Sequence, residues 1–144
     1  MKIIIYIILF IVAIIIIKTS KEPPVVNDVR ERYEILKDHI KNNKVPGHFE
    51  HLDRDVDLTF FTKKYDEVGY NVNKGQEIGL CVDGEANEIF HVLLHELAHS
   101  SVPEYNHSKL YWERFNELKK ICIDLGIYQK ISTKQEFCGK HIKD

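Results

Sequence analysis

The residues best suited to chemistry form the segment His95-Glu96-Leu97-Ala98-His99, an HExxH pattern inside an apolar run. On a helix, residues four apart lie one above the other, so His95 and His99 can offer imidazole nitrogens to one metal ion. Glu96 is turned about 100° toward the same cleft. Two imidazoles and a third protein ligand leave one position of Zn²⁺ open for water, and a carboxylate beside that water can take its proton. The pattern predicts a zinc peptidase site with Glu96 as general base.

Several residues are candidates for the third ligand. His91 lies in the same helix, but the rise from His91 to His99 is about 12 Å, so all three histidines of that run cannot reach one ion. His91 therefore suits a packing or outer-layer role. His107 is the best placed, because it follows the turn at Pro103 and the chain can reverse there. Carboxylates remain as alternatives, namely Glu104, Glu113 and Glu117.

Three phenols are candidate donors to a developing oxyanion, those of Tyr105, Tyr111 and Tyr128. For each, packing is the favoured interpretation. His48 and His51 also lie close together in the sequence, but no carboxylate or cysteine is placed to complete a second metal site, which favours surface histidines.

The zinc motif needs a helix that packs against a sheet. Apolar positions from Ile89 to Ala98 predict the buried face of that helix, with Asn87 as its N-cap and an end before Pro103. A second helix is expected from Ser108 to Leu125, closed by Gly126, and an earlier one from Asn27 to Asn42. Alternating residues predict strands at 56–60, 65–72 and 78–82, with a tight turn at 73–75. The strand at 78–82 leads directly into the metal helix, and an exposed edge there can bind an extended peptide by adding it to the sheet. The tail from Ile127 is expected to be irregular.

The chain begins with a run of 15 apolar residues, Ile3 to Ile17, between Lys2 and Lys18. We interpret residues 1–19 as an uncleaved single-pass transmembrane anchor, because charge stands where a signal peptidase requires small residues. Residues 20–27, with Pro23 and Pro24, are expected to form a stalk, and residues 28–144 one domain.

Composition restricts the partners. From Thr19 onward the chain has 18 Lys or Arg against 22 Asp or Glu, and no long basic run, so nucleic acid is not an expected partner. Three cysteines, Cys81, Cys122 and Cys138, form neither a CxxC motif nor an even set, which predicts free thiols and a domain on the reducing, cytosolic side of a membrane.

The zinc motif and the segment from His107 to Phe115 together resemble the SprT-like and WLM group of small zinc metallopeptidases. The resemblance is strongest to WLM-like metallopeptidases of large DNA viruses and some protists, and it covers Tyr65 to Ile142. It rests also on four shorter blocks, Tyr70 to Gly75, Ile78 to Cys81, Leu125 to Tyr128 and Phe137 to Gly139. Asn106 departs from the group, which often has glycine just before the third histidine.

The resemblance implies a small zincin-like α+β fold: a short antiparallel sheet, an active-site helix and flanking helices. It also implies zinc on His95, His99 and His107, with Glu96 as base. We therefore expect a membrane-anchored zinc peptidase acting on peptides or proteins. The alternative is a catalytically silent zincin that serves as a structural or binding protein of a membrane or virion. A DNA–protein cross-link protease is disfavoured by the acidic domain, and the DNA-binding modules of such relatives are absent.

Overall fold

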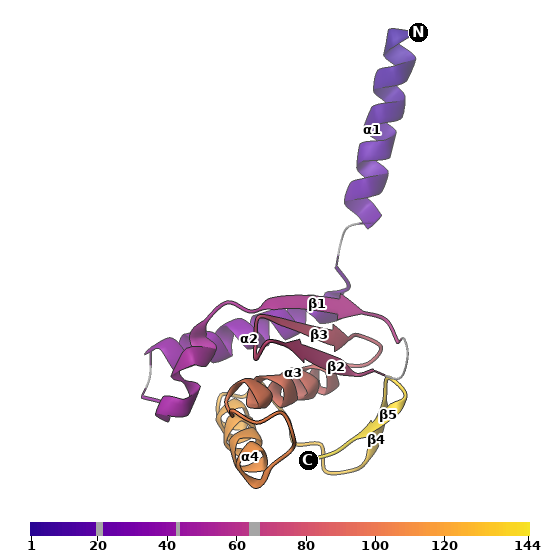
Figure 1. Cartoon of the computed structure of the whole chain (residues 1–144). Coiled ribbons are helices and arrows are strands. Elements are labelled where there is room, and N and C mark those ends of the chain that lie inside the picture. The colour runs from indigo at the N-terminus through magenta and orange to yellow at the C-terminus, as the bar shows by residue number, and fades with distance from the viewer. Residues whose placement is uncertain (20–21, 43, 64–66) are drawn as a thin grey trace.

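The computed structural model describes residues 1–19, 22–42, 44–63 and 67–144. Helices and short strands alternate in an α+β arrangement in which a three-stranded sheet lies over helix α3 (Ala86–Ser100), as Figure 1 shows. The other helices are α1 (Lys2–Thr19), α2 (Pro24–Asn42), the 3₁₀ helix η1 (Gly47–Asp53) and α4 (Lys109–Asp124).

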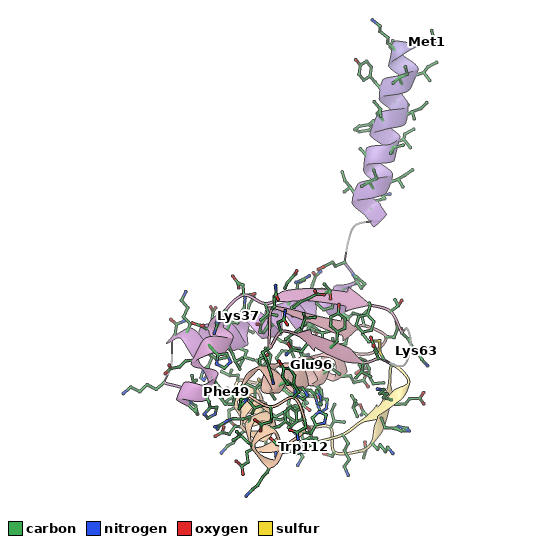
Figure 2. The ribbon with its side chains drawn as sticks, in the orientation of Figure 1. Met1, Lys37, Phe49, Lys63, Glu96 and Trp112 are labelled. Carbon is green, nitrogen blue, oxygen red and sulfur yellow. A yellow bond between two sulfur atoms is a disulfide. The ribbon has the colours of Figure 1, made fainter. Side chains whose placement is uncertain are left out.

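Helix α1 extends away from the other elements, and its described side chains are exposed from Lys2 to Lys18 (Figure 2). No helix within the described ranges has both the length and the apolar character needed to cross a membrane. The predicted transmembrane anchor, and the single-pass membrane location that followed from it, are therefore wrong. The physical reason is length, because 15 apolar residues rise only about 22 Å against a hydrocarbon core of about 30 Å.

Helix α2 begins at Pro24, earlier than predicted and inside the segment expected to be a stalk. Proline suits the first turn of a helix, because its missing N–H would have no partner there. Ser20 and Lys21, the start of the predicted stalk, lie outside the described residues. The buried stripe of α2 includes Val29, Tyr33 and Leu36, and it packs against η1 and α3.

The sheet has the strand order β1 (Asp57–Phe61), β3 (Glu77–Cys81), β2 (Gly69–Val72). It is mixed and not antiparallel as predicted, because β1 pairs parallel with β3 and β2 pairs antiparallel with it. The strand next to α3 in sequence, β3, lies in the centre and is buried along most of its length. Within the described residues, the free edge beside α3 therefore belongs to β2.

Helix α3 is the central element of the core. It packs against β2 and β3 of the sheet and against α2 and α4, and most of its side chains up to Ala98 are buried. Its N-cap is Glu85 and not Asn87 as predicted, and the carboxylate of Glu88 accepts a hydrogen bond from the Glu85 N–H at 2.9 Å. The side-chain amide of Asn87 instead donates to the carbonyl of Gln129 and accepts from its backbone N–H. The helix ends at Ser100, ahead of Pro103, as predicted.

The tail is more ordered than the sequence predicted. β4 (Gln135–Phe137) and β5 (Lys140–Ile142) form an antiparallel hairpin whose turn residues, Cys138 and Gly139, both have positive φ. Cys138 forms a disulfide with Cys81 at the end of β3 (Figure 2), and Cys122 is a free, buried thiol. The prediction of three free thiols is therefore wrong, and the argument that it supplied for a reducing compartment no longer holds.

Candidate metal centre

Three imidazoles converge beside the C-terminal half of α3, those of His95, His99 and His107. Nε2 of His107 lies 3.2 Å from Nε2 of His95 and 3.1 Å from Nε2 of His99. One ligand atom from each residue lies within 4.8 Å of the others, and this is the one such group among the described residues. Nitrogens bound tetrahedrally at 2.0–2.1 Å from one zinc ion are about 3.3 Å apart. The two distances from His107 match this value, and the three nitrogens are close enough together that they could hold one ion.

Burial controls the protonation of the helix histidines. Desolvation, with the neighbouring histidines as a smaller cause, lowers the pKa of His95 to about 3. Desolvation lowers the pKa of His99 to about 4, and the positive charges of His107 and Lys74 contribute to a smaller extent. Both imidazoles are therefore neutral at pH 7, which is the form that binds a metal ion. The donor set fits a divalent cation that prefers nitrogen ligands, as zinc does.

Glu96 lies on the same helix beside the cluster and is 7% exposed. Burial raises the pKa of its carboxyl group to about 7. The neighbouring strand passes close by, because a Cβ added at Gly69 of β2 would lie 3.4 Å from Oε1 of Glu96. The carboxylate is thus enclosed between α3 and the free edge of the sheet, beside the histidine cluster.

Helix α4 forms the floor beneath the imidazoles. The ring of Tyr111 lies 4.4 Å from that of His99 and 4.7 Å from that of His107, measured between centroids. Its hydroxyl donates to the carbonyl of His95 at 3.3 Å. Burial, the largest cause, raises the pKa of Tyr111 far above its usual value. Because this hydroxyl is engaged with the backbone, Tyr111 is a packing residue under the site, and the oxyanion role considered for it is not supported.

Ser108 fixes the start of α4 directly after His107. Its side chain accepts from the N–H of Tyr111 at 3.1 Å, the usual arrangement of an N-cap serine. The Ser108 hydroxyl also donates to the carboxylate of Glu104. Glu104 is therefore held outside the cluster, in the loop that carries His107.

The two other carboxylate candidates for the third ligand lie apart from the histidines. Glu113 pairs with Lys109 on the exposed face of α4 at 3.8 Å. Glu117 accepts from His48 at 2.7 Å and from Arg114 at 3.3 Å. Of the ligand candidates considered from sequence, the structure brings only His107 to the two helix histidines.

Two side chains that sequence reasoning missed hold the site in place. Asn71 of β2 donates to the carbonyl of Glu96 at 2.7 Å and to the hydroxyl of Ser100 at 2.9 Å. Lys74, in the turn after β2, donates to the carbonyl of His99 at 3.0 Å and to the carbonyl of Glu104. These bonds tie the end of α3 to the sheet and to the His107 loop. Both residues stand in the block Tyr70 to Gly75, which was a signal available in the sequence.

His91 lies one turn before His95 and is buried. Its Nδ1 lies 2.7 Å from the hydroxyl of Tyr128, which also donates to the carboxylate of Asp144. Desolvation lowers the pKa of His91 to about 4. His91 is thus part of a buried polar network behind the candidate ligands. This agrees with the prediction that it supports the site and does not bind the metal ion.

A cleft of about 190 Å³ opens beside Glu96 and His99, and it is also lined by Asn71, Lys74 and Tyr105. The Tyr105 side chain is 81% exposed, and the ammonium group of Lys74 lies 4.2 Å from its ring centroid. Of the three phenols considered from sequence, Tyr105 is therefore the one that lines this cleft.

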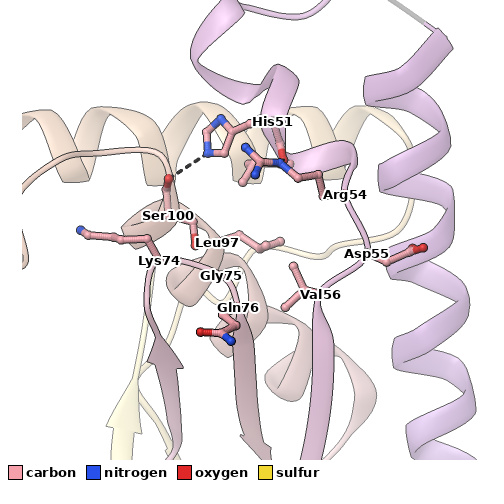
Figure 3. A pocket seen from close by; sticks show the side chains of 10 residues that line it. His51, Arg54, Asp55, Val56, Lys74, Gly75, Gln76, Leu97 and Ser100 are labelled. Carbon is pink, nitrogen blue, oxygen red and sulfur yellow. Dashed lines mark hydrogen bonds between the residues drawn. The ribbon is translucent and has the colours of Figure 1, made fainter.

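Figure 3 shows a separate cavity of about 290 Å³ between η1, the turn after β2 and the end of α3. His51 lines it and contacts the carbonyl of Ser100 at 2.8 Å. None of the cluster histidines lines this cavity, and neither does Glu96. His51 and His48 are half-buried residues with protein partners, so neither is a simple surface histidine.

An HExxH helix carrying two histidines, with a third from the following loop, is the arrangement found in zincin-type metalloproteins. A family model for the WLM domain matches residues 58–143, and the chain belongs to this family, which is associated with zinc binding and with peptidase activity. The chain is also similar to an uncharacterised protein of Acanthamoeba polyphaga mimivirus, with 32% identity over 129 residues. That match covers 77% of this chain and 66% of the viral protein. No solved structure matches the chain.

Proposed function

We propose that this protein is a zinc-dependent peptidase in which His95, His99 and His107 hold the ion and Glu96 is the general base. The observation that supports this most directly is the convergence of three imidazole nitrogens beside a buried carboxylate on the same helix. A structural zinc site normally has four protein ligands. Among the described residues the candidate ligands number three, which favours a catalytic site over the catalytically silent alternative.

Glu96 would move the proton during hydrolysis. Bound zinc would supply Lewis acidity, which polarises a carbonyl and lowers the pKa of water. The Glu96 carboxylate would accept a proton from the attacking water and then donate it to the leaving nitrogen. Tyr105, at the mouth of the cleft, is the candidate donor to the oxygen that gains charge.

A peptide or protein is the substrate class that the sheet favours. β2 is an edge strand that passes against Glu96, and an extended peptide can add to such an edge through backbone hydrogen bonds. This would hold a backbone carbonyl near the histidine cluster. Asn71 and Lys74 would act as positioning residues, because they fix the end of α3 relative to that edge.

The proposal is tested by metal content and hydrolysis on the full chain. We expect one zinc per chain by mass spectrometry in the wild type, in Glu96→Gln and in the control His39→Ala. In His107→Ala we expect metal affinity to fall at least about tenfold. Hydrolysis of a denatured protein substrate should fall by about 10²-fold or more in Glu96→Gln. A folded wild type that binds no zinc, or a Glu96→Gln variant with full activity, would refute the proposal.

A further inference from the structure

A second cavity adjoins the cluster at His95 and has a different character from the cleft at Glu96. Its volume is about 210 Å³. We call it the Trp112 pocket, and it is lined by Val68, His91, Val92, His95, Trp112, Phe115, Lys140, His141, Ile142 and Lys143. Half of these side chains are apolar. The pocket and the cleft therefore flank the histidine cluster with unlike chemistry.

The edge strand connects the two cavities. Val68, directly before β2, lines the Trp112 pocket, while Asn71 within β2 lines the cleft with Glu96 and His99. Three residues of extended chain span about 10 Å. A peptide added along β2 would therefore pass from one cavity to the other across the cluster. A side chain next to the scissile bond would then meet the Trp112 pocket.

The size and the walls of the pocket suit a large apolar side chain. An apolar cavity of about 150 Å³ is enough to bind benzene, and the Trp112 pocket has about 210 Å³. Trp112 is 46% exposed at its wall, whereas Phe115 behind it is buried. Nδ1 of His91 is already engaged with Tyr128, so this wall offers little competing polarity. Filling the pocket would cover apolar surface that is now open to water.

The rim is basic. Lys140, His141 and Lys143 are exposed on the β4–β5 hairpin and its end. Neither lysine has a carboxylate partner within the described part of the chain. The Cys81–Cys138 disulfide joins the hairpin turn to β3, which holds this rim in position. Fixed, unpaired positive charge at the mouth favours a negatively charged residue beside the apolar one.

We infer that the Trp112 pocket binds a bulky apolar side chain of the substrate next to the scissile bond, and that Lys140 and Lys143 select acidic residues beside it. The inference rests on the proposed peptidase function, since it names the substrate class of that site.

Trp112 makes occupancy of the pocket directly measurable, because it is the only tryptophan in the chain. The zinc-loaded full-length Glu96→Gln variant is titrated with peptides of about ten residues, following both Trp112 emission and the anisotropy of a labelled peptide. One peptide has Phe between two Asp residues, a second has Ala in place of Phe, and a third has Lys in place of each Asp. We expect the first peptide to shift Trp112 emission to shorter wavelength and to bind at least about tenfold more tightly than the other two.

Charge reversal tests the rim separately. Lys140→Glu/Lys143→Glu should abolish or invert the preference for Asp over Lys and leave the preference for Phe over Ala unchanged. The matched control is Lys120→Glu/Lys134→Glu, which makes the same change in net charge on exposed positions outside the pocket. The control should keep the Asp preference. Raising the ionic strength should weaken that preference in the parent, since exposed charges are screened by salt.

The possible outcomes distinguish a failure of the pocket inference from a failure of the peptidase proposal. Equal affinity for the Phe and Ala peptides, binding without a change in Trp112 emission, or no binding of any peptide would overturn the apolar assignment. An Asp preference that survives rim reversal would overturn the role of the lysines. Selective binding to Glu96→Gln with no cleavage by the wild type would refute the peptidase proposal alone. Cleavage without Phe selectivity would refute the pocket alone.

Discussion

Asn71 is the side chain through which β2 holds the C-terminal half of α3. One amide group donates to the carbonyl of Glu96 and to the hydroxyl of Ser100, and its oxygen accepts from the N–H of Gly75 at 2.7 Å. The orientation of His99 and Glu96 therefore depends on a strand residue that takes no part in the zinc motif. Outer residues of this kind commonly influence metal affinity.

Replacing Asn71 should lower the zinc affinity of the protein and have only a modest effect on its free energy of unfolding. We expect Asn71→Ala to lower the free energy of unfolding by about 1–2 kcal/mol, because two acceptors lose their donor. We expect its zinc affinity to fall about tenfold. Urea unfolding and competition with a chromophoric chelator measure the two effects. Asn116→Ala on the exposed face of α4 is the control and should change neither, and an unchanged zinc affinity in Asn71→Ala would contradict the positioning role.

His91 should make stability depend on pH. Its pKa is lowered to about 4 in the folded chain by desolvation, whereas an unfolded histidine has a pKa near 6.5. Between pH 4 and 6.5, His91 is protonated in the unfolded state but neutral in the folded state. The stabilisation is therefore fully present above pH 6.5 and is lost as the pH falls toward 4.

The contribution of His91 can be isolated in metal-free protein. Between pH 6.5 and 4 we expect the wild type to lose about 3 kcal/mol more stability than His91→Phe, whose ring cannot take a proton. Tyr128 keeps Asp144 as hydrogen-bond partner in that variant. Urea unfolding across this pH range measures the difference. Parallel pH profiles for the two proteins would show that His91 does not titrate in this range.

The β4–β5 hairpin is joined to the sheet by one covalent bond. Cys138 in its turn bonds to Cys81 at the end of β3, across a sequence separation of 57 residues. Phe137 packs against the segment before α3, because a Cβ added at Gly84 would lie 2.4 Å from its ring. The hairpin is therefore fixed where it forms one wall of the Trp112 pocket.

Reduction should destabilise the chain substantially. Closing a loop of this length restricts the unfolded state by about 4 kcal/mol in the chain-entropy model, so we expect about that loss of unfolding free energy on adding a phosphine reductant. Cys81→Ala/Cys138→Ala should start at the lower stability and show no further effect of reductant. Cys122→Ala, which removes the free thiol, should retain the full effect. Identical unfolding curves of the wild type with and without reductant would show that the bond does not form.

Asp144 connects the tail to the core behind the candidate site. Its carboxylate accepts from Lys119 at 2.7 Å, from Tyr128, and from the N–H of Ile131 at 2.7 Å. Both members of the ion pair are buried, with side chains 9% and 4% exposed. Although burial alone would raise it, the pKa of Asp144 is lowered because these donors outweigh desolvation.

Replacing one member of the Lys119–Asp144 pair should lower the free energy of unfolding more than replacing both members. Asp144→Asn should destabilise the protein by about 3–5 kcal/mol, because the charge of Lys119 is left buried without a partner. Adding Lys119→Met should recover much of that loss, since no charge then remains. Thermal unfolding of the two single variants and the double variant tests this as a cycle. Equal stabilities for Asp144→Asn and the double variant would mean that Lys119 finds another partner or water.

The sequence alone was sufficient for features that depend on local spacing. Backbone preferences and helical periodicity account for the HExxH spacing, the end of α3 before Pro103, the turn at residues 73–75 and the end of α4 ahead of Gly126. The β4–β5 hairpin escaped notice because its strands are only three residues long and its turn is Cys-Gly, not a common turn pair. The apolar run before Lys18 predicted a membrane anchor by its composition, but its 15 residues are short for a membrane span.

Only the tertiary structure decided how distant segments meet. It brought His107 next to His95 and His99 and put β2, not β3, at the free edge. It also paired Cys81 with Cys138 and revealed the hydrogen bonds from Asn71 and Lys74 to the end of α3. Local patterns carry no information on such contacts, because they depend on how strands pair and helices pack across the whole chain. The zinc motif is therefore local in sequence, while the geometry that would make it a working site comes from long-range packing.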